Sequence, residues 1–274
     1  MHGLIRILLI VVAAVLTLGT GIMAQDAEQD VPANSVNGNS QASDSYEVLE
    51  PEVMHVDAAA SLACVVQLPD NFNPESSYTL VIGLHGYGAN PDRYLTNWYA
   101  FDSPEFIYAV PQAPYAYWQG TYLGYSWWLL GDDDPEQWRH GVDLSQDYVL
   151  SIVDEISSRY NVSGVYALGF SQGAVLGYAL GIKHFDVFSG VACITGWLET
   201  SWLSDSELVQ AAGELRVFIA HGDEDPALPL DVAYASRDIL SEHGYDVEFH
   251  GFDCDEHTLT PEILQLVEDW VEGE

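Results

Sequence analysis

Short apolar runs typical of strands alternate with helical patterns along most of the chain. The predicted strands are residues 61–68, 79–84, 106–110, 165–168, 187–194, 215–220 and 247–252. The predicted helices are residues 144–160, 172–181, 230–243 and 261–271, the first with large apolar residues at steps of four. Strands separated by helices predict an α/β fold with a mostly parallel central sheet and helices on both faces.

Residues 115–138 interrupt this alternation. The stretch is too long for a tight connection and too aromatic for a solvated loop. Its aromatic residues are Tyr115, Tyr117, Trp118, Tyr122, Tyr125, Trp127, Trp128 and Trp138. The acidic run Asp132-Asp133-Asp134 within it predicts a solvated turn. The rings either fill part of the core or line a surface over a functional site, and the pattern favours both interpretations equally.

The first 24 residues differ from the rest of the chain. His2 and Arg6 precede an apolar run over residues 7–18, and residues 19–24 end with a small residue, Ala24, at a plausible cleavage site. This order predicts a signal peptide over residues 1–24 and a secreted or periplasmic protein. An uncleaved membrane anchor is the alternative, because the run is just long enough. Residues 25–45 are predicted to be a flexible polar linker and residues 46–274 one folded domain.

The charge balance is strongly acidic. The chain has 7 Lys and Arg residues against 42 Asp and Glu residues, a formal net charge of −35. Such a surface repels phosphate backbones and anionic headgroups, which argues against nucleic acid and acidic membranes as partners. It favours a solubility adaptation in which the counterions of a salty habitat screen the self-repulsion. Because no His, Cys, Asp and Glu residues cluster at metal-ligand spacing, we expect no metal or cofactor.

One segment has the pattern of a nucleophile. Gly169-Phe170-Ser171-Gln172-Gly173 fits G-x-S-x-G and lies between a predicted strand and a predicted helix. In such a sharp turn the serine hydroxyl points out above the sheet, and the flanking glycines permit the tight backbone. The start of the helix presents free N–H groups to a developing oxyanion. Ser171 is therefore the candidate nucleophile, with a simple helix N-cap as the alternative.

A serine nucleophile needs a base and an acid, which follow it in the order acid, then histidine. The histidines downstream are His184, His221, His243, His250 and His257. We favour His257, because it follows the last predicted strand and precedes a helix. The candidate acids lie just after the strand 215–220, at the end where such sheets carry their chemistry. By position alone, Asp223 or Asp225 could serve.

A second oxyanion N–H is expected from an early junction of strand and loop. Residues 84–90, Leu-His-Gly-Tyr-Gly-Ala-Asn, follow the predicted strand 79–84. The glycine after His85 lets the backbone turn so that its amides point at the site. An ordinary glycine turn is the alternative interpretation.

Taken together, Leu84-His85-Gly86-Tyr87-Gly88, the serine segment and His221-Gly222-Asp223-Glu224-Asp225-Pro226 resemble the phospholipase/carboxylesterase/thioesterase family of α/β-hydrolases. The resemblance extends from about Glu47 to the end of the chain. It implies an α/β-hydrolase fold and hydrolysis of a small-molecule or lipid-like ester, without a cofactor. It also implies that the acid is Asp225, the base is His257, and the oxyanion amides are those of Tyr87 and Gln172.

The aromatic stretch, the acidity and the export signal depart from this family. If the stretch forms a wall over Ser171, Trp127 and Trp128 are candidate substrate-binding residues that favour an apolar or aromatic acyl group. A feruloyl- or polyester-type esterase is one alternative function, and a peptidase on the same fold is another. A non-catalytic binding protein of this fold is the alternative of a different class.

Overall fold

The computed structural model describes residues 61–130 and 135–273. The predicted signal peptide (residues 1–24), the linker (25–45), residues 46–60 and the acidic run Asp132-Asp133-Asp134 lie outside the described residues. Within the described ranges, no helix is both long and apolar enough to cross a membrane.

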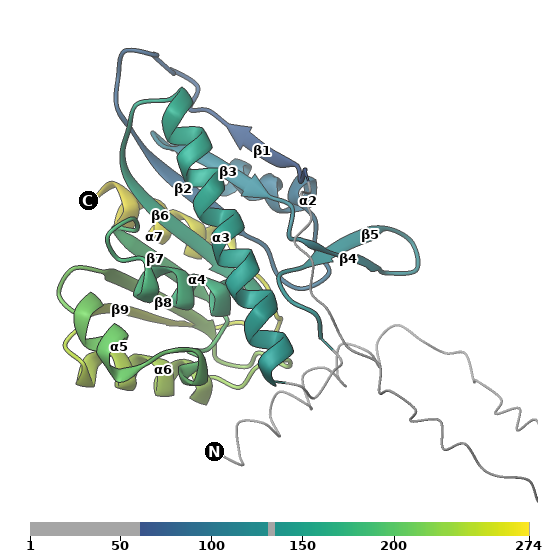
Figure 1. The fold of residues 1–274 in the computed structure, drawn as a ribbon, viewed down its shortest axis with the longest axis vertical. Coiled ribbons are helices and arrows are strands. Elements are labelled where there is room, and N and C mark those ends of the chain that lie inside the picture. The colour runs from purple at the N-terminus through teal and green to yellow at the C-terminus, as the bar shows by residue number, and fades with distance from the viewer. Residues whose placement is uncertain (1–60, 131–134, 274) are drawn as a thin grey trace, which may run out of the picture.

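A seven-stranded sheet forms the centre of the molecule, in the order β1-β3-β2-β6-β7-β8-β9 (Figure 1). Its strands are β1 Cys64–Gln67, β2 Tyr78–Leu84, β3 Ile107–Pro111, β6 Val162–Phe170, β7 Gly190–Ile194, β8 Arg216–Gly222 and β9 Asp246–Phe252. Only β1 runs antiparallel to its neighbour, and the other strand pairs are parallel. The predicted α/β fold with a mostly parallel sheet is confirmed.

Helices cover both faces of the sheet. One face packs against α3 Pro135–Arg159, α4 Gln172–Lys183, α5 Asp205–Ala211 and α6 Asp231–Glu242. The other packs against α2 Pro91–Leu95, the 3-10 helix η1 Thr96–Ala100 and α7 Pro261–Glu272. A second 3-10 helix, η2, spans Thr200–Trp202. The sheet therefore separates two hydrophobic core clusters, as expected for a parallel sheet buried on both sides.

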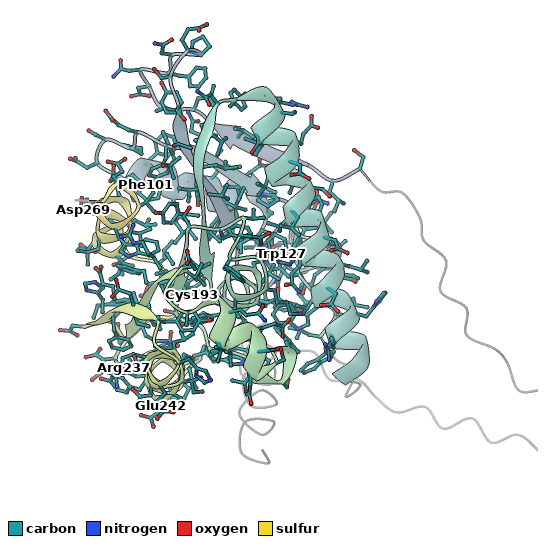
Figure 2. The ribbon with its side chains drawn as sticks, turned by 60° about the vertical axis from the view of Figure 1, so that its left-hand side comes forward. Phe101, Trp127, Cys193, Arg237, Glu242 and Asp269 are labelled. Atoms are coloured by element: carbon teal, nitrogen blue, oxygen red, sulfur yellow. The ribbon has the colours of Figure 1, made fainter. Side chains whose placement is uncertain are left out.

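The small apolar residues after Ser171 explain why α4 packs so closely on the sheet. All but one of its 12 residues are buried. A Cβ atom at Gly181 would lie 2.5 Å from Val191 Cγ1 on β7, so only glycine permits this approach. In Figure 2, Cys193 on β7 and Trp127 lie in the interior, whereas Arg237 and Glu242 of α6 lie at the periphery. The helix that begins after Ser171 is thus held firmly against the strand beside it.

Several elements were missed by the sequence pattern. The aromatic stretch contains a hairpin of β4 Tyr115–Trp118 and β5 Leu123–Ser126, which pair antiparallel away from the main sheet (Figure 1). The helix predicted over 144–160 begins at Pro135, a residue suited to the first turn of a helix. The helices α2 and α5 and both 3-10 helices are too short for a clear period.

Candidate active site

Ser171 lies at the sharp turn between β6 and α4. Its backbone has φ 54° and ψ −119°, a conformation that costs free energy for any residue other than glycine. The glycines on either side make the turn possible: a Cβ atom at Gly169 would lie 2.3 Å from Gly173 O, and one at Gly173 would lie 1.9 Å from Leu84 O. The G-x-S-x-G pattern thus corresponds to a strained turn that presents the serine at the carboxyl end of the sheet.

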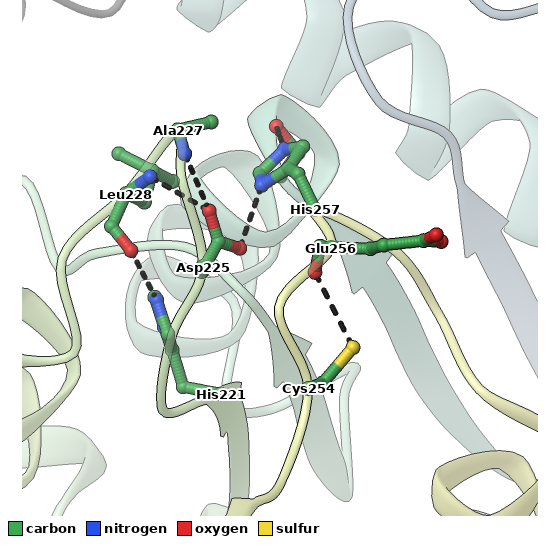
Figure 3. Close-up of polar contacts among 8 residues, drawn as sticks. His221, Asp225, Ala227, Leu228, Cys254, Glu256 and His257 are labelled. Atoms are coloured by element: carbon green, nitrogen blue, oxygen red, sulfur yellow. Dashed lines mark hydrogen bonds and ion pairs between the residues drawn. The ribbon is translucent and has the colours of Figure 1, made fainter.

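The structure brings the three predicted side chains into one hydrogen-bonded chain. Ser171 Oγ lies 2.9 Å from His257 Nε2. On the other side of the imidazole, His257 Nδ1 lies 2.8 Å from Asp225 Oδ2 (Figure 3). Because a carboxylate only accepts, Nδ1 carries the proton and Nε2 is left to accept from the serine hydroxyl. Asp225 follows β8 and His257 follows β9, so neighbouring parallel strands deliver both groups to the same edge.

The Asp225 carboxylate is buried and fully occupied. Its other oxygen, Oδ1, accepts hydrogen bonds from the N–H groups of Ala227 (2.7 Å) and Leu228 (2.8 Å) (Figure 3). Burial alone would raise the pKa of Asp225, but the hydrogen bonds from His257, Leu228 and Ala227 outweigh it and lower the pKa below its usual value. The carboxylate is therefore charged at neutral pH, as required to stabilise a protonated imidazole.

Asp223, the other candidate acid, is directed elsewhere. Its Oδ1 accepts the Cys254 N–H at 3.1 Å. His221 is not the base. Its Nε2 donates to Leu228 O at 2.9 Å and so bonds to the loop that carries Asp225 (Figure 3). His243 binds the Ile239 carbonyl at the end of α6, and His250 pairs with Glu248 on β9. Of the histidines after the serine, only His257 contacts Ser171 among the described residues.

The two predicted oxyanion amides lie in segments adjoining Ser171. Gln172 is the first residue of α4, so its N–H has no acceptor within the helix. Tyr87 follows Gly86, whose hypothetical Cβ would lie 3.4 Å from Ser171 Cβ. Across residues 61–130 and 135–273, the Tyr87 N–H donates to no protein acceptor. Both N–H groups are therefore available to a ligand oxygen.

Trp127 and Trp128 do not form a substrate surface, and this prediction is wrong. Their exposed fractions are 0% and 2%, and both belong to the core cluster shared with α3 and α4. Trp128 packs edge-on against Trp202. Apolar rings on a segment that lies between two helices gain more from burial than from lining a solvated site. The core-filling interpretation holds for these two residues, while Trp118 on the hairpin is 65% exposed.

The described residues contain no group of three or more His, Cys, Asp or Glu side chains arranged to hold a metal ion. The three cysteines, Cys64, Cys193 and Cys254, are free thiols.

A family model described as phospholipase/carboxylesterase matches residues 73–273. The chain belongs to this family. Among curated relatives, acyl-protein thioesterase 1 of Neurospora crassa is 31% identical over 135 residues, which are 48% of this chain and 55% of the relative. The chain thus spans about half the length of that family member.

Solved structures of a thioesterase and an esterase share the fold. Acyl-protein thioesterase 2 of Zea mays superposes with a TM-score of 0.62 at 19% identity, covering 77% of this chain and 98% of the other. Esterase PE8 superposes with a TM-score of 0.63 at 19% identity, covering 78% and 99%. The fold is therefore the α/β-hydrolase fold of the phospholipase/carboxylesterase family.

Proposed function

We propose that this protein is a serine carboxylic-ester hydrolase that acts through an acyl-enzyme on Ser171. The observation that supports it most directly is the unbroken chain of hydrogen bonds from Ser171 Oγ through His257 to Asp225. Membership of the phospholipase/carboxylesterase family and the likeness to an acyl-protein thioesterase support the same class of reaction.

In the first step, Ser171 Oγ attacks the ester carbonyl while His257 Nε2 takes its proton. Asp225 accepts the hydrogen bond from His257 Nδ1, which fixes the tautomer and stabilises the imidazolium as it forms. The tetrahedral intermediate collapses when His257 returns the proton to the leaving alkoxide. The products are a free alcohol and an acyl group bonded to Ser171.

In the second step, water takes the place of the alcohol. His257 removes a proton from the water, which attacks the acyl carbonyl, and the proton then returns to Ser171 Oγ as the carboxylic acid leaves. In both steps the negative charge develops on the carbonyl oxygen, where the N–H groups of Tyr87 and Gln172 stabilise it. Their lack of a competing protein acceptor supports this assignment.

The substrate class is a small-molecule or lipid-like carboxylic ester or thioester. A strongly acidic protein with a formal charge of −35 disfavours polyanionic substrates, whereas neutral esters meet no such repulsion. The alternative is a feruloyl- or polyester-type esterase, which would use the same acyl-enzyme reaction on other esters. It would appear as turnover of aryl or polymeric esters well above that of short alkyl esters.

The test compares the purified protein with Ser171→Ala on nitrophenyl esters of increasing acyl length. We expect the variant to lose more than about 10⁴-fold in kcat, since removal of a serine nucleophile leaves only binding and oxyanion stabilisation. Ser206→Ala, at an exposed position on α5, is the matched control and should keep full activity. An active Ser171→Ala variant would exclude this serine as the nucleophile, and a wild-type protein inactive on all esters would favour a binding protein.

Export of the enzyme is part of the proposal and rests on the pattern of residues 1–24. Expression of the full chain in a secreting host, followed by N-terminal sequencing of the accumulated protein, decides it. A mature chain beginning at Gln25 supports a cleaved signal peptide. A chain that keeps Met1 and sediments with membranes supports the anchored alternative.

A further inference from the structure

The two oxyanion amides belong to segments far apart in the sequence, and one buried residue bonds to both. The Trp127 indole Nε1 donates to the carbonyl of His85, two residues before Tyr87, at 2.8 Å. The backbone N–H of Trp127 donates to Oε1 of Gln172 at 3.1 Å. Trp127 has no exposed surface, so water does not compete for either bond.

The Gln172 side chain is held by a small buried network. Besides accepting from Trp127, its Nε2 donates to Ser126 Oγ at 2.9 Å, and Ser126 in turn donates to the Trp128 carbonyl. On the other side, Ser145 of α3 donates to the Trp127 carbonyl. Each polar group of Trp127 therefore has a protein partner, and this fixes its position relative to α3 and α4.

The adjoining strand β5 is hydrogen-bonded to residues 85–90, the oxyanion loop that carries Tyr87. Gly88 N–H donates to Tyr125 O, and Tyr125 N–H donates to Ala89 O, each at 2.8 Å. A Cβ atom at Gly124 would lie 1.9 Å from Gly88 O, so the two backbones are in direct contact. The imidazole of His85 also packs against the Trp127 ring, with centroids 5.1 Å apart. The loop that carries Tyr87 is thus joined to residues 124–127 on both sides of Tyr87.

We propose that Trp127 is a positioning residue that sets the distance between the two oxyanion N–H groups. This inference rests on the proposed function and assigns the aromatic stretch a role in it other than substrate binding. Oxyanion donors act only when they lie about 2.7–3.1 Å from the charged oxygen, and a misplacement of about 1 Å can cost 10²-fold in rate. A rigid link between their two segments serves the transition state and makes no contact with the bound substrate.

The experiment replaces Trp127 with phenylalanine, which keeps a buried ring and removes the N–H donor to His85. The matched control is Trp202→Phe, a buried tryptophan of the same core cluster that has no bond to His85 or Gln172. We expect kcat to fall about 10- to 100-fold in Trp127→Phe with KM within about twofold of wild type. Affinity for a boronic acid, which forms a tetrahedral anion on Ser171, should fall in parallel. Trp202→Phe should lower the stability of the protein but leave kcat and the affinity for the boronic acid unchanged.

Two further variants keep the test decisive if Trp127→Phe fails to fold. Incorporation of benzothienylalanine at position 127 exchanges the indole N–H for sulfur and preserves the shape of the ring. Gln172→Met removes the side-chain acceptor for the Trp127 backbone N–H and leaves the backbone N–H at position 172 in place. A fall in kcat in both variants supports the inference. Wild-type kcat in a folded benzothienylalanine variant overturns it.

Amide hydrogen exchange separates this inference from the proposed function, because it needs no substrate. The amide exchange rates of the peptides that contain Tyr87 and Gln172 should rise in the benzothienylalanine variant. In Trp202→Phe the same rates should equal those of the wild type. Unchanged exchange in both peptides overturns the positioning role, whatever the activity. Faster exchange in a protein that hydrolyses no ester would keep the positioning role and reject the ester hydrolase.

Discussion

The two sides of Ser171 are built in different ways. On one side lie side-chain groups, the imidazole of His257 and the carboxylate of Asp225, delivered by loops after the neighbouring strands β8 and β9. On the other side lie backbone N–H groups, whose positions depend on contacts made by residues 124–127. Residue identity therefore specifies the side-chain groups beside Ser171, whereas packing specifies the positions of the backbone N–H groups.

Among the predicted variants, the largest effect on kcat is expected on the side of Ser171 that carries His257 and Asp225. Asp225→Asn keeps the shape of the side chain but places an amide against His257 Nδ1, which favours the wrong imidazole tautomer. We expect kcat to fall about 10⁴-fold with little change in KM. Steady-state kinetics on a nitrophenyl ester measures both constants.

Asp223→Asn is the control for this prediction, because sequence position alone allowed either acid. Its carboxylate accepts from Cys254 N–H and does not touch His257. We expect less than about a tenfold loss of kcat, the scale of one displaced hydrogen bond. The reverse ranking of the two variants would show that the acid had been assigned to the wrong residue.

On the amide side, backbone contact makes glycine essential at one position of α4. Gly173→Ala would place a methyl group 1.9 Å from Leu84 O and 2.8 Å from His85 O, forcing α4 away from β2 and the oxyanion loop. We expect the free energy of unfolding to fall by about 3 kcal/mol. Urea denaturation followed by circular dichroism measures the loss.

One helical turn further on, Gly177→Ala provides the contrast. Its methyl group would meet Cys193 Sγ at 3.5 Å, an ordinary van der Waals distance. Because alanine is the better helix former, we expect a gain of about 0.5–1 kcal/mol. Equal losses in the two variants would mean that general crowding along α4, and not the contact with the oxyanion loop, determines the cost.

The structure also predicts a pH dependence of stability on the oxyanion side, below the cost of Gly173→Ala in size. Burial lowers the pKa of His85 to about 4, although the hydrogen bond to Gly86 O opposes the shift. Since the unfolded chain takes up this proton near pH 6.5 and the folded chain does not, stability is lost as the pH falls from 6.5 towards 4. Between about pH 7 and about pH 5 this contribution amounts to about 2 kcal/mol.

His85→Asn removes the titration, and its amide can still donate to Gly86 O. Urea unfolding of both proteins at the two pH values measures the difference in slope, which cancels the titration of the many surface carboxylates. We expect wild type to lose about 2 kcal/mol more than the variant. Parallel slopes would mean that His85 is protonated in the folded state.

Much of the fold was predictable because strands and long helices have clear periods. The seven strands of the main sheet and the helices α3, α4, α6 and α7 follow from apolar runs in the sequence. The β4–β5 hairpin was not predictable, because its exposed Trp118 and half-buried Tyr117 break the alternation of apolar and polar residues. Its strand β5 also bonds to the backbone of Gly88 and Ala89, a contact that no local pattern encodes.

The same distinction applies to the site. Ser171, Asp225 and His257 could be proposed from motifs because each needs a particular side chain at a strand end. The hydrogen bonds of Trp127 and Ser126 to His85 and Gln172 could not be predicted, because they join residues more than forty positions apart. The aromatic character of Trp127 suited either a substrate surface or the core, and the structure places it in the core with its indole N–H bonded to His85 O.

The outermost strand β9 has a consequence for association between molecules. As the last strand of the sheet within residues 61–130 and 135–273, it leaves one row of backbone groups open to pairing with a further strand. Exposed Asp246 and Glu248 lie along it, and every copy of the chain carries the same acidic charges. Repulsion between these like charges therefore opposes edge-to-edge aggregation of the folded protein, and added salt weakens that protection by screening them.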